Sequence, residues 1–156
     1  LRRALDESSL ALQDATLYVN QLSSELETTR RDANMLVDTL SVLRAGDMVL
    51  VDLVGQGPAP GAIGRAFVSQ GRGVVFHAER LPEPARGRTY QLWVLPDGAS
   101  PVSAGTFDVN AFGMTTLASG PSSAYSRVSA VAVTDEPDGG SDGPTTTPLL
   151  VGTVRN

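Results

Sequence analysis

Apolar side chains recur every three or four residues along the first 43 positions of the chain. The spacing alternates between four and three without a break, which is the a/d pattern of a left-handed coiled coil. We therefore predict a long helix with one apolar seam, in which Ala15, Ala33, Ser8 and Thr29 are small or polar members. The predicted coiled-coil interface consists of Leu5, Leu12, Val19, Leu22, Leu26, Leu36, Leu40 and Leu43.

The composition of the chain changes near residue 45, where the predicted helix ends. Neither Gly nor Pro occurs up to that residue, and all 16 Gly and 10 Pro follow it. Gly46 fits a helix C-cap. Because only Gly46 and Asp47 precede the first predicted strand, the connection is too short to act as a flexible tether. We expect three side chains to pack at this junction: Val42, Leu43 and Met48.

The seam of the predicted helix needs a partner. A helix of this length would extend about 65 Å, whereas a domain of about 110 residues has a radius of gyration of about 13 Å and cannot cover it. We favour self-association into a parallel dimer or trimer, in which Glu25 at a g position would meet Arg30 at the following e position. A helical hairpin and another protein's helix are the alternatives, although residues 20–31 offer no Gly or Pro for a turn.

Short apolar segments separated by turn residues follow from residue 48 onward. Alternating apolar and polar positions between Gly, Pro and Asp turns are typical of strands. The predicted strands span residues 48–54, 63–69, 73–79, 88–95, 102–107, 114–118, 127–134 and 149–154. Since no helical period separates them, they indicate an antiparallel sandwich or barrel, of which we favour the sandwich. The predicted fold is α+β, with a coiled-coil helix over 1–45 and an all-β antiparallel sandwich over 46–156.

The strand at residues 88–95 shows the alternation most clearly. Tyr90, Leu92 and Val94 lie on one face and are predicted to be core. Trp93 lies on the opposite face, where a lone Trp in a small domain is more often buried than exposed. An exposed Trp93 or Tyr125 would instead favour a module that binds a sugar or a peptide.

Composition excludes several kinds of chemistry. The net charge of −5 argues against binding of nucleic acid or anionic lipid. Without cysteine and with His77 as the single histidine, the chain has no thiolate nucleophile and no Cys/His metal cluster. A serine hydrolase would need His77 as its base, in a cleft beside a serine or a carboxylate, and no Gly-x-Ser-x-Gly motif supports one. We predict no catalytic residue, no cofactor and no metal, and therefore no enzyme.

One acidic cluster lies in the polar loop at residues 135–148, which is predicted to be mobile. Asp135, Glu136, Asp138 and Asp142 could offer oxygen ligands to Ca²⁺, but their spacing does not match an EF-hand loop. A solvated acidic loop is the favoured interpretation.

Three segments of the second region share their order and spacing with one protein family. They are Tyr90-Gln-Leu-Trp-Val-Leu-Pro-Asp-Gly98, Pro101-Val-Ser-Ala-Gly-Thr-Phe107 and Ala130-Val-Ala-Val-Thr-Asp-Glu-Pro-Asp-Gly-Gly-Ser141. With them, residues 48–154 resemble the C-terminal, extracytoplasmic domain of bacterial anti-sigma-K factors of the RskA type. Asp138 departs from the pattern, since a small residue often stands there.

The resemblance implies the regulatory part of a single-pass protein of the cell membrane. In this family a cytoplasmic domain holds a sigma factor, and regulated proteolysis frees it. The chain would then lie on the extracytoplasmic side, with the sigma factor bound by a cytoplasmic domain outside it. Further expected partners are a second copy of the chain and a site-1-type protease or another envelope protein. The alternative function is a β-sandwich module that recognises a cell-wall glycan or a peptide.

Overall fold

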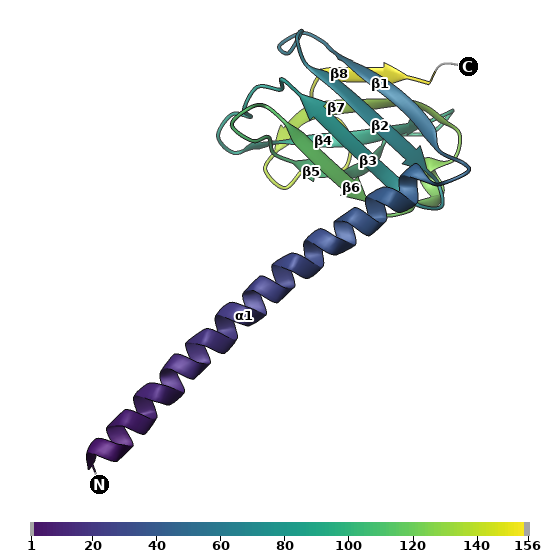
Figure 1. Cartoon of the computed structure of the whole chain (residues 1–156). Coiled ribbons are helices and arrows are strands. Elements are labelled where there is room, and N and C mark those ends of the chain that lie inside the picture. The colour runs from purple at the N-terminus through teal and green to yellow at the C-terminus, as the bar shows by residue number, and fades with distance from the viewer. Residues whose placement is uncertain (1, 155–156) are drawn as a thin grey trace. The chain divides into compact units, whose positions relative to one another are not determined.

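The computed structural model describes the backbone of residues 2–154 and the side chains of residue 10 and of residues 12–154. The chain forms two compact units, Leu1–Val37 and Asp38–Asn156. Helix α1 (Arg2–Leu43) runs without a break from the first unit into the second (Figure 1). Because no turn interrupts its 42 residues, the alternative of a helical hairpin is wrong.

The last six residues of α1, 38–43, belong to the second unit. Val42 is buried there with 1% of its surface exposed, whereas Leu43 is 41% exposed. Met48 is half-buried. The expected packing at the junction is therefore confirmed for Val42 and wrong for Leu43.

In the part of the chain that the structure describes, eight strands follow α1, and every neighbouring pair is antiparallel. A short 3-10 helix, Ser123–Tyr125, precedes the seventh strand. The strands are β1 (Val49–Gly55), β2 (Ile63–Ser69), β3 (Gly73–Glu79), β4 (Arg88–Pro96), β5 (Val102–Phe107), β6 (Thr115–Ser119), β7 (Val128–Pro137) and β8 (Leu150–Thr153). Each predicted strand is confirmed, with its ends shifted by at most three residues.

The strands form one curled sheet, so the predicted sandwich of two sheets is wrong. Their order is β5-β4-β7-β8-β1-β2-β3-β6 (Figure 1). Strand β8 pairs with both β7 and β1 and so joins what would otherwise be two sheets. At the two edges β5 contacts β6, and the Leu117 side chain lies against Gly105, which makes the sheet nearly closed and barrel-like. Inward and outward positions alternate in a sandwich and in a barrel alike, so the sequence pattern could not separate them.

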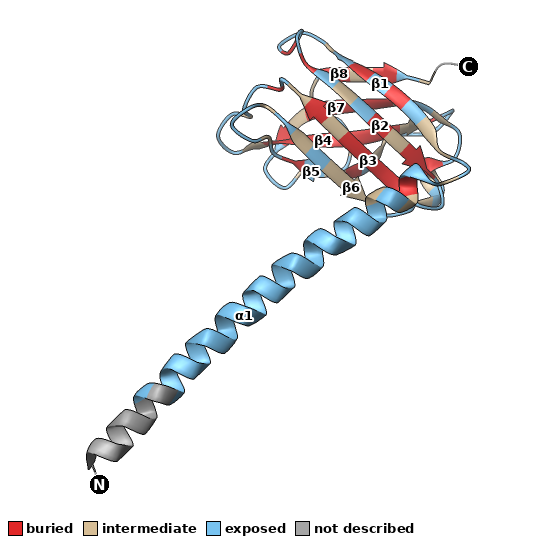
Figure 2. Cartoon of the chain, viewed as in Figure 1, coloured by how far each residue is buried: buried red, intermediate tan, exposed pale blue. Residues whose placement is uncertain are grey.

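The core lies inside this curled sheet. Alternate residues of the strands point into it, which gives the bands of buried residues along the strands in Figure 2. Tyr90, Leu92 and Val94 of β4 are all buried, as predicted. The ring of Phe107 packs between Phe76 and Tyr90, with centroid distances of 5.5 Å and 5.7 Å.

Strand β4 is buried on its second face as well. Trp93 points away from the core side chains and is nevertheless fully buried, as the sequence predicted. Gln91, on the same face, binds the loop after β7: its amide nitrogen donates to the Ser141 carbonyl at 3.0 Å, and its amide oxygen accepts from the Ser141 N–H at 2.8 Å. Gly140 has a φ of +82°, and a Cβ there would lie 2.9 Å from the Gln91 amide oxygen, so only glycine fits. The loop therefore acts as a cover over β4.

The turn after α1 is tied to the hairpin between β2 and β3. The carboxylate of Asp47 accepts a hydrogen bond from the Ser69 hydroxyl at 2.6 Å and one from the Gly71 N–H at 3.4 Å. The hydrogen bond from Ser69 is the main reason why the pKa of Asp47 is lowered. The Ser69 hydroxyl also accepts from the Arg72 N–H at 3.1 Å, which fixes the hairpin turn.

Candidate functional site

The apolar seam of α1 is accessible along the part of the helix whose side chains are described (Figure 2). Its Leu and Val side chains are between 41% and 69% exposed: Leu12, Val19, Leu22, Leu26, Leu36, Leu40 and Leu43. Leu5, the remaining residue of the predicted interface, lies outside the described side chains. The coiled-coil interface stays a prediction, and its described members are open to a partner.

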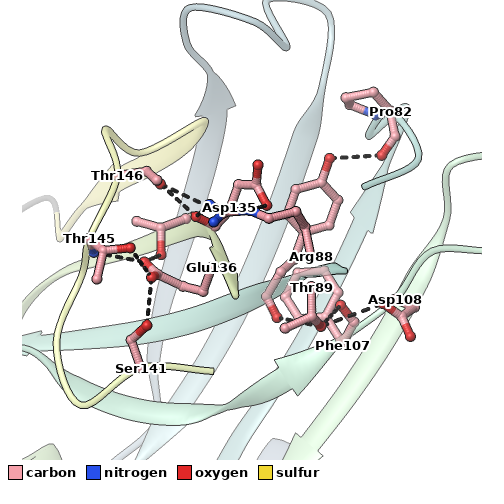
Figure 3. Close-up of polar contacts among 12 residues, drawn as sticks. Pro82, Arg88, Thr89, Phe107, Asp108, Asp135, Glu136, Ser141, Thr145 and Thr146 are labelled. Carbon is pink, nitrogen blue, oxygen red and sulfur yellow. Dashed lines mark hydrogen bonds and ion pairs between the residues drawn. The ribbon is translucent and has the colours of Figure 1, made fainter. Parts of the chain in front are cut away.

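A buried carboxylate at the end of β7, Glu136, holds the loop that covers β4 (Figure 3). Its Oε1 accepts from the Thr134 hydroxyl at 2.5 Å and from the Thr145 N–H at 2.9 Å. Its Oε2 accepts from the Ser141 hydroxyl at 2.9 Å and from the Thr145 hydroxyl. Thr134 in turn accepts from Trp93 Nε1 at 2.8 Å. A chain of hydrogen bonds therefore runs from the single indole through Thr134 to the carboxylate.

Glu136 keeps its negative charge without a basic partner among the described residues. Burial raises the pKa of Glu136, but the hydrogen bonds from Thr134, Thr145 and Ser141 outweigh burial and lower it to about 2. Hydrogen bonds donated to an ionised carboxylate favour that form over the protonated one. Because every donor comes from β7 or its loop, Glu136 anchors the loop rather than facing a ligand.

The neighbouring Asp135 points to the other side of β7 and makes an ion pair. Arg88 donates from Nε to the Asp135 carboxylate at 3.1 Å and from a terminal nitrogen to its carbonyl at 2.6 Å (Figure 3). Burial, with a smaller effect of the Asp135 charge, raises the pKa of Tyr90 to about 12. The Tyr90 hydroxyl donates to the Pro82 carbonyl at 2.8 Å, so the ring stays fixed and neutral.

The four acidic residues of the loop do not act as one cluster. Asp135 is paired, Glu136 is buried, and Asp138 and Asp142 are exposed. Among the side chains that the structure describes, no three His, Asp or Glu residues gather as metal ligands would. The interpretation of a solvated acidic loop is therefore wrong for Glu136, which instead fixes the loop.

A polar row crosses the outer face of the sheet. The strand register places Asp52 beside Arg65, Arg65 beside His77, and His77 beside Thr116. Arg65 donates to Asp52 at 2.7 Å. His77 Nδ1 lies 3.1 Å from the Thr116 hydroxyl, and Nε2 lies 3.2 Å from a Glu79 carboxylate oxygen. Both ring nitrogens of the single histidine are thus engaged at the surface.

His77 lines a groove of about 440 Å³ together with Asp52 and Glu79. The enzyme alternative required this histidine in a cleft beside a serine or a carboxylate. Glu79 supplies the carboxylate, but the described lining contains no serine, threonine or other hydroxyl nucleophile. The hydroxyl that is hydrogen-bonded to His77 is that of Thr116, which is not part of the described lining of this groove.

A second groove of about 770 Å³ lies along β1 and β8. Strand β1 pairs with β8 through Val54 and Gly55. The residues that line this groove include Leu50, Asp52 and Val151. Phe, Tyr and Trp are absent from the described lining of both grooves. The binding-module alternative required Trp93 or Tyr125 to be exposed, and this is wrong because they are 0% and 5% exposed.

A family model described as the C-terminal part of anti-sigma-K factor RskA matches residues 8–149. The chain belongs to the RskA C-terminal domain family. The match begins within α1, so this RskA C-terminal domain includes most of the helix, whereas the resemblance apparent in the sequence covered residues 48–154. No helix in the described part of the domain is long and apolar enough to cross a membrane.

Two curated relatives align with this RskA C-terminal domain over 92 residues. One is an uncharacterized protein in the phr 5′ region of Streptomyces griseus, at 38% identity, with 58% of this chain and 37% of the relative covered. The other is anti-sigma-K factor RskA of Mycolicibacterium vanbaalenii, at 37% identity, with 59% of this chain and 37% of the relative covered. The chain thus spans little more than a third of these proteins. No solved structure matches the chain.

Sequence reasoning missed the chain of hydrogen bonds that ends at Glu136. A carboxylate directly before Pro137 at a strand end is typical of an exposed turn. The one available signal was the run of hydroxyl residues at 145–147, which offers donors without any nearby Lys or Arg. In the RskA C-terminal domain these donors fold back onto the end of β7.

Proposed function

We propose that the chain is the extracytoplasmic regulatory domain of a single-pass anti-sigma factor, which controls release of a sigma factor through regulated proteolysis. Membership of the RskA C-terminal family carries this proposal, and the relative named as an anti-sigma-K factor supports it. We assign sigma-factor binding and the membrane anchor to segments outside this chain, because it covers 37% of that relative.

The domain performs this role as an interaction module and not as an enzyme. Both nitrogens of His77 are engaged by Thr116 and Glu79, and the groove beside it has no hydroxyl nucleophile in its described lining. The carboxylate of Glu136 is occupied by internal donors. The net charge of −5 disfavours nucleic acid as a partner. Its expected partners are proteins of the envelope, among them a site-1-type protease.

The location of the domain is tested by chemical labelling of the full-length protein in intact cells. The chain has no cysteine, so Asp138→Cys introduces one at an exposed position once cysteines elsewhere in the protein are replaced. A membrane-impermeant maleimide should label this variant in intact cells. Leu92→Cys, buried in the core, is the control that should stay unlabelled until the protein is unfolded. Labelling of Asp138→Cys only after the cells are lysed would refute the extracytoplasmic location.

The regulatory role is tested with a promoter reporter for the cognate sigma factor. Overproduction of the full-length protein should lower reporter output. Removal of residues 38–156 from the full-length protein should leave sigma-factor binding intact but alter proteolysis of the remaining protein and its response to envelope stress. A reporter that responds identically with and without these residues would refute a regulatory role for the domain.

A further inference from the structure

Helix α1 has few contacts of its own to stabilise it. Among its described side chains it makes one ion pair, between Arg31 and Glu27 at 3.5 Å, and both partners are at least 70% exposed. An exposed pair of this kind contributes little to stability. Most of the stability of helices in proteins comes from packing of an apolar face. The seam of α1 therefore requires another helix beside it.

The seam can be buried without leaving a polar group unsatisfied. Thr29 is its one polar member between residues 12 and 43. The Thr29 hydroxyl donates to the carbonyl of Glu25 within α1 at 3.0 Å, so that position presents its methyl group outward without an unmet hydrogen bond. Ala15 and Ala33 are small and allow two helix backbones to approach closely at these points.

The charges beside the seam are complementary to a second copy in parallel orientation. In a parallel pair each g position faces the e position five residues later on the other helix. Glu25 would then meet Arg30 of the second copy, twice by symmetry, and Asp32 would meet the uncharged Val37. An antiparallel pair in which the two seams from Leu12 to Leu43 overlap fully would instead set Glu25 against Asp32, which is a repulsive contact.

We propose that α1 is a dimerisation helix, which pairs in parallel and in register with α1 of a second copy of this chain. The interface is the seam from Leu12 to Leu43, flanked by the Glu25–Arg30 pairs. The inference does not rest on the proposed function, because it follows from the exposed seam, the internal bond of Thr29 and the self-complementary charges.

Sedimentation of the 156-residue chain tests the dimer. The wild type should show twice the monomer mass at micromolar concentration, and Leu22→Asp should be monomeric because it would bury a charge in the seam. Leu17→Asp, on the opposite face at an f position and also exposed, is the matched control and should stay dimeric. Fluorescence of Trp93 shows in each variant that the sheet domain is folded. A wild type that is monomeric or trimeric, or a seam variant that still dimerises, would overturn the proposal.

Disulfide formation tests the orientation. In the proposed dimer Ala15→Cys lies opposite its own copy, within reach of a disulfide. Full antiparallel overlap of the seams from Leu12 to Leu43 would instead place it opposite Leu40. Mild oxidation should therefore cross-link most of Ala15→Cys and little of Leu17→Cys, which points away from the seam. Equal cross-linking of the two variants, or none of Ala15→Cys, would contradict a parallel pair in register.

Charge exchange tests the flanking pairs. Glu25→Lys or Arg30→Glu alone would turn two attractions into repulsions and should raise the dissociation constant on the order of tenfold. The double variant should return it to near the wild-type value. The same exchange at Glu27 and Arg31, which lie on the outer face of the helix, should leave the dissociation constant unchanged. A double variant as weak as the single ones would show that Glu25 and Arg30 do not face one another.

Discussion

The helix and the sheet domain use the same aliphatic residues in opposite ways. Leu26 of α1 is 69% exposed, whereas Leu92 of β4 is fully buried. The helix follows a strictly local repeat, and its seam is satisfied only if something outside the chain covers it. The domain has no simple repeat, yet it covers both faces of β4 from within. A regular repeat of apolar residues in a sequence can therefore indicate an exposed surface that binds a partner, as well as a buried core.

The largest expected difference in stability between the two regions comes from replacing one leucine by alanine in each. Leu92→Ala should destabilise the sheet domain by about 2–5 kcal/mol, because it leaves a cavity in a closed core. Leu26→Ala should leave the unfolding of the sheet domain unchanged, since its side chain contributes nothing to that core. Urea unfolding followed by Trp93 fluorescence measures both. A loss below about 0.5 kcal/mol for Leu92→Ala would mean that the face of β4 is misassigned.

A smaller effect is expected at the anchor of the covering loop. Glu136→Gln keeps the shape of the side chain but removes the charge that strengthens its hydrogen bonds, and should destabilise the domain by about 1–3 kcal/mol. Asp138→Asn, a similar change at an exposed position of the same loop, is the control and should stay within about 0.5 kcal/mol of the wild type. Similar losses of stability in both variants would show that the net charge of the loop matters, and not the hydrogen bonds of Glu136.

Acid should reduce this difference in stability between wild type and Glu136→Gln. The pKa of Glu136 is about 2 in the folded protein against 4.5 for the free group, so the unfolded chain takes up its proton first. The contribution of the ionised group is present above about pH 4.5 and is lost as pH falls towards about 2, by about 3 kcal/mol in all. Unfolding curves for both proteins at pH 7 and pH 3 measure the change. A gap that is constant between these pH values would contradict the lowered pKa.

A still smaller effect is expected on the outer face of the sheet. His77→Ala removes contacts with Glu79 and Thr116, both at the surface, and should change the stability of the domain by less than about 0.5 kcal/mol. The signalling output of the intact protein should also be unchanged. Loss of output in a folded His77→Ala protein would identify the groove beside this residue as a functional site.

The smallest effect is expected when the helix is removed. A chain that begins at Asp38 retains Val42 and the tie between Asp47 and Ser69, and its unfolding midpoint should match that of the 156-residue chain at low concentration. A clear drop in the midpoint would show that the sheet domain depends on the helix.

Local signals in the sequence were enough to predict the strands and much of the core. Alternation along β4 identified Tyr90, Leu92 and Val94 as core residues, because the order of residues within one strand determines which side chains share a face. The sequence of one strand does not show which distant strand it pairs with. Whether β8 joins β1 as well as β7 depends on residues nearly the whole domain apart, and this decided one sheet over two. The burial of Glu136 depended on Thr145 folding back over it, which no single segment encodes.

The contact between the two edge strands affects how copies of the domain behave when they are crowded together. Molecules joined by their helices hold their sheets at a high local concentration. Open strand edges under such conditions recruit one another and lead to aggregation. Here β5 and β6 lie against each other, with Leu117 over Gly105, so each edge is shielded by the other edge of the same sheet. The domain can thus be concentrated at a surface with little risk that its sheets will polymerise.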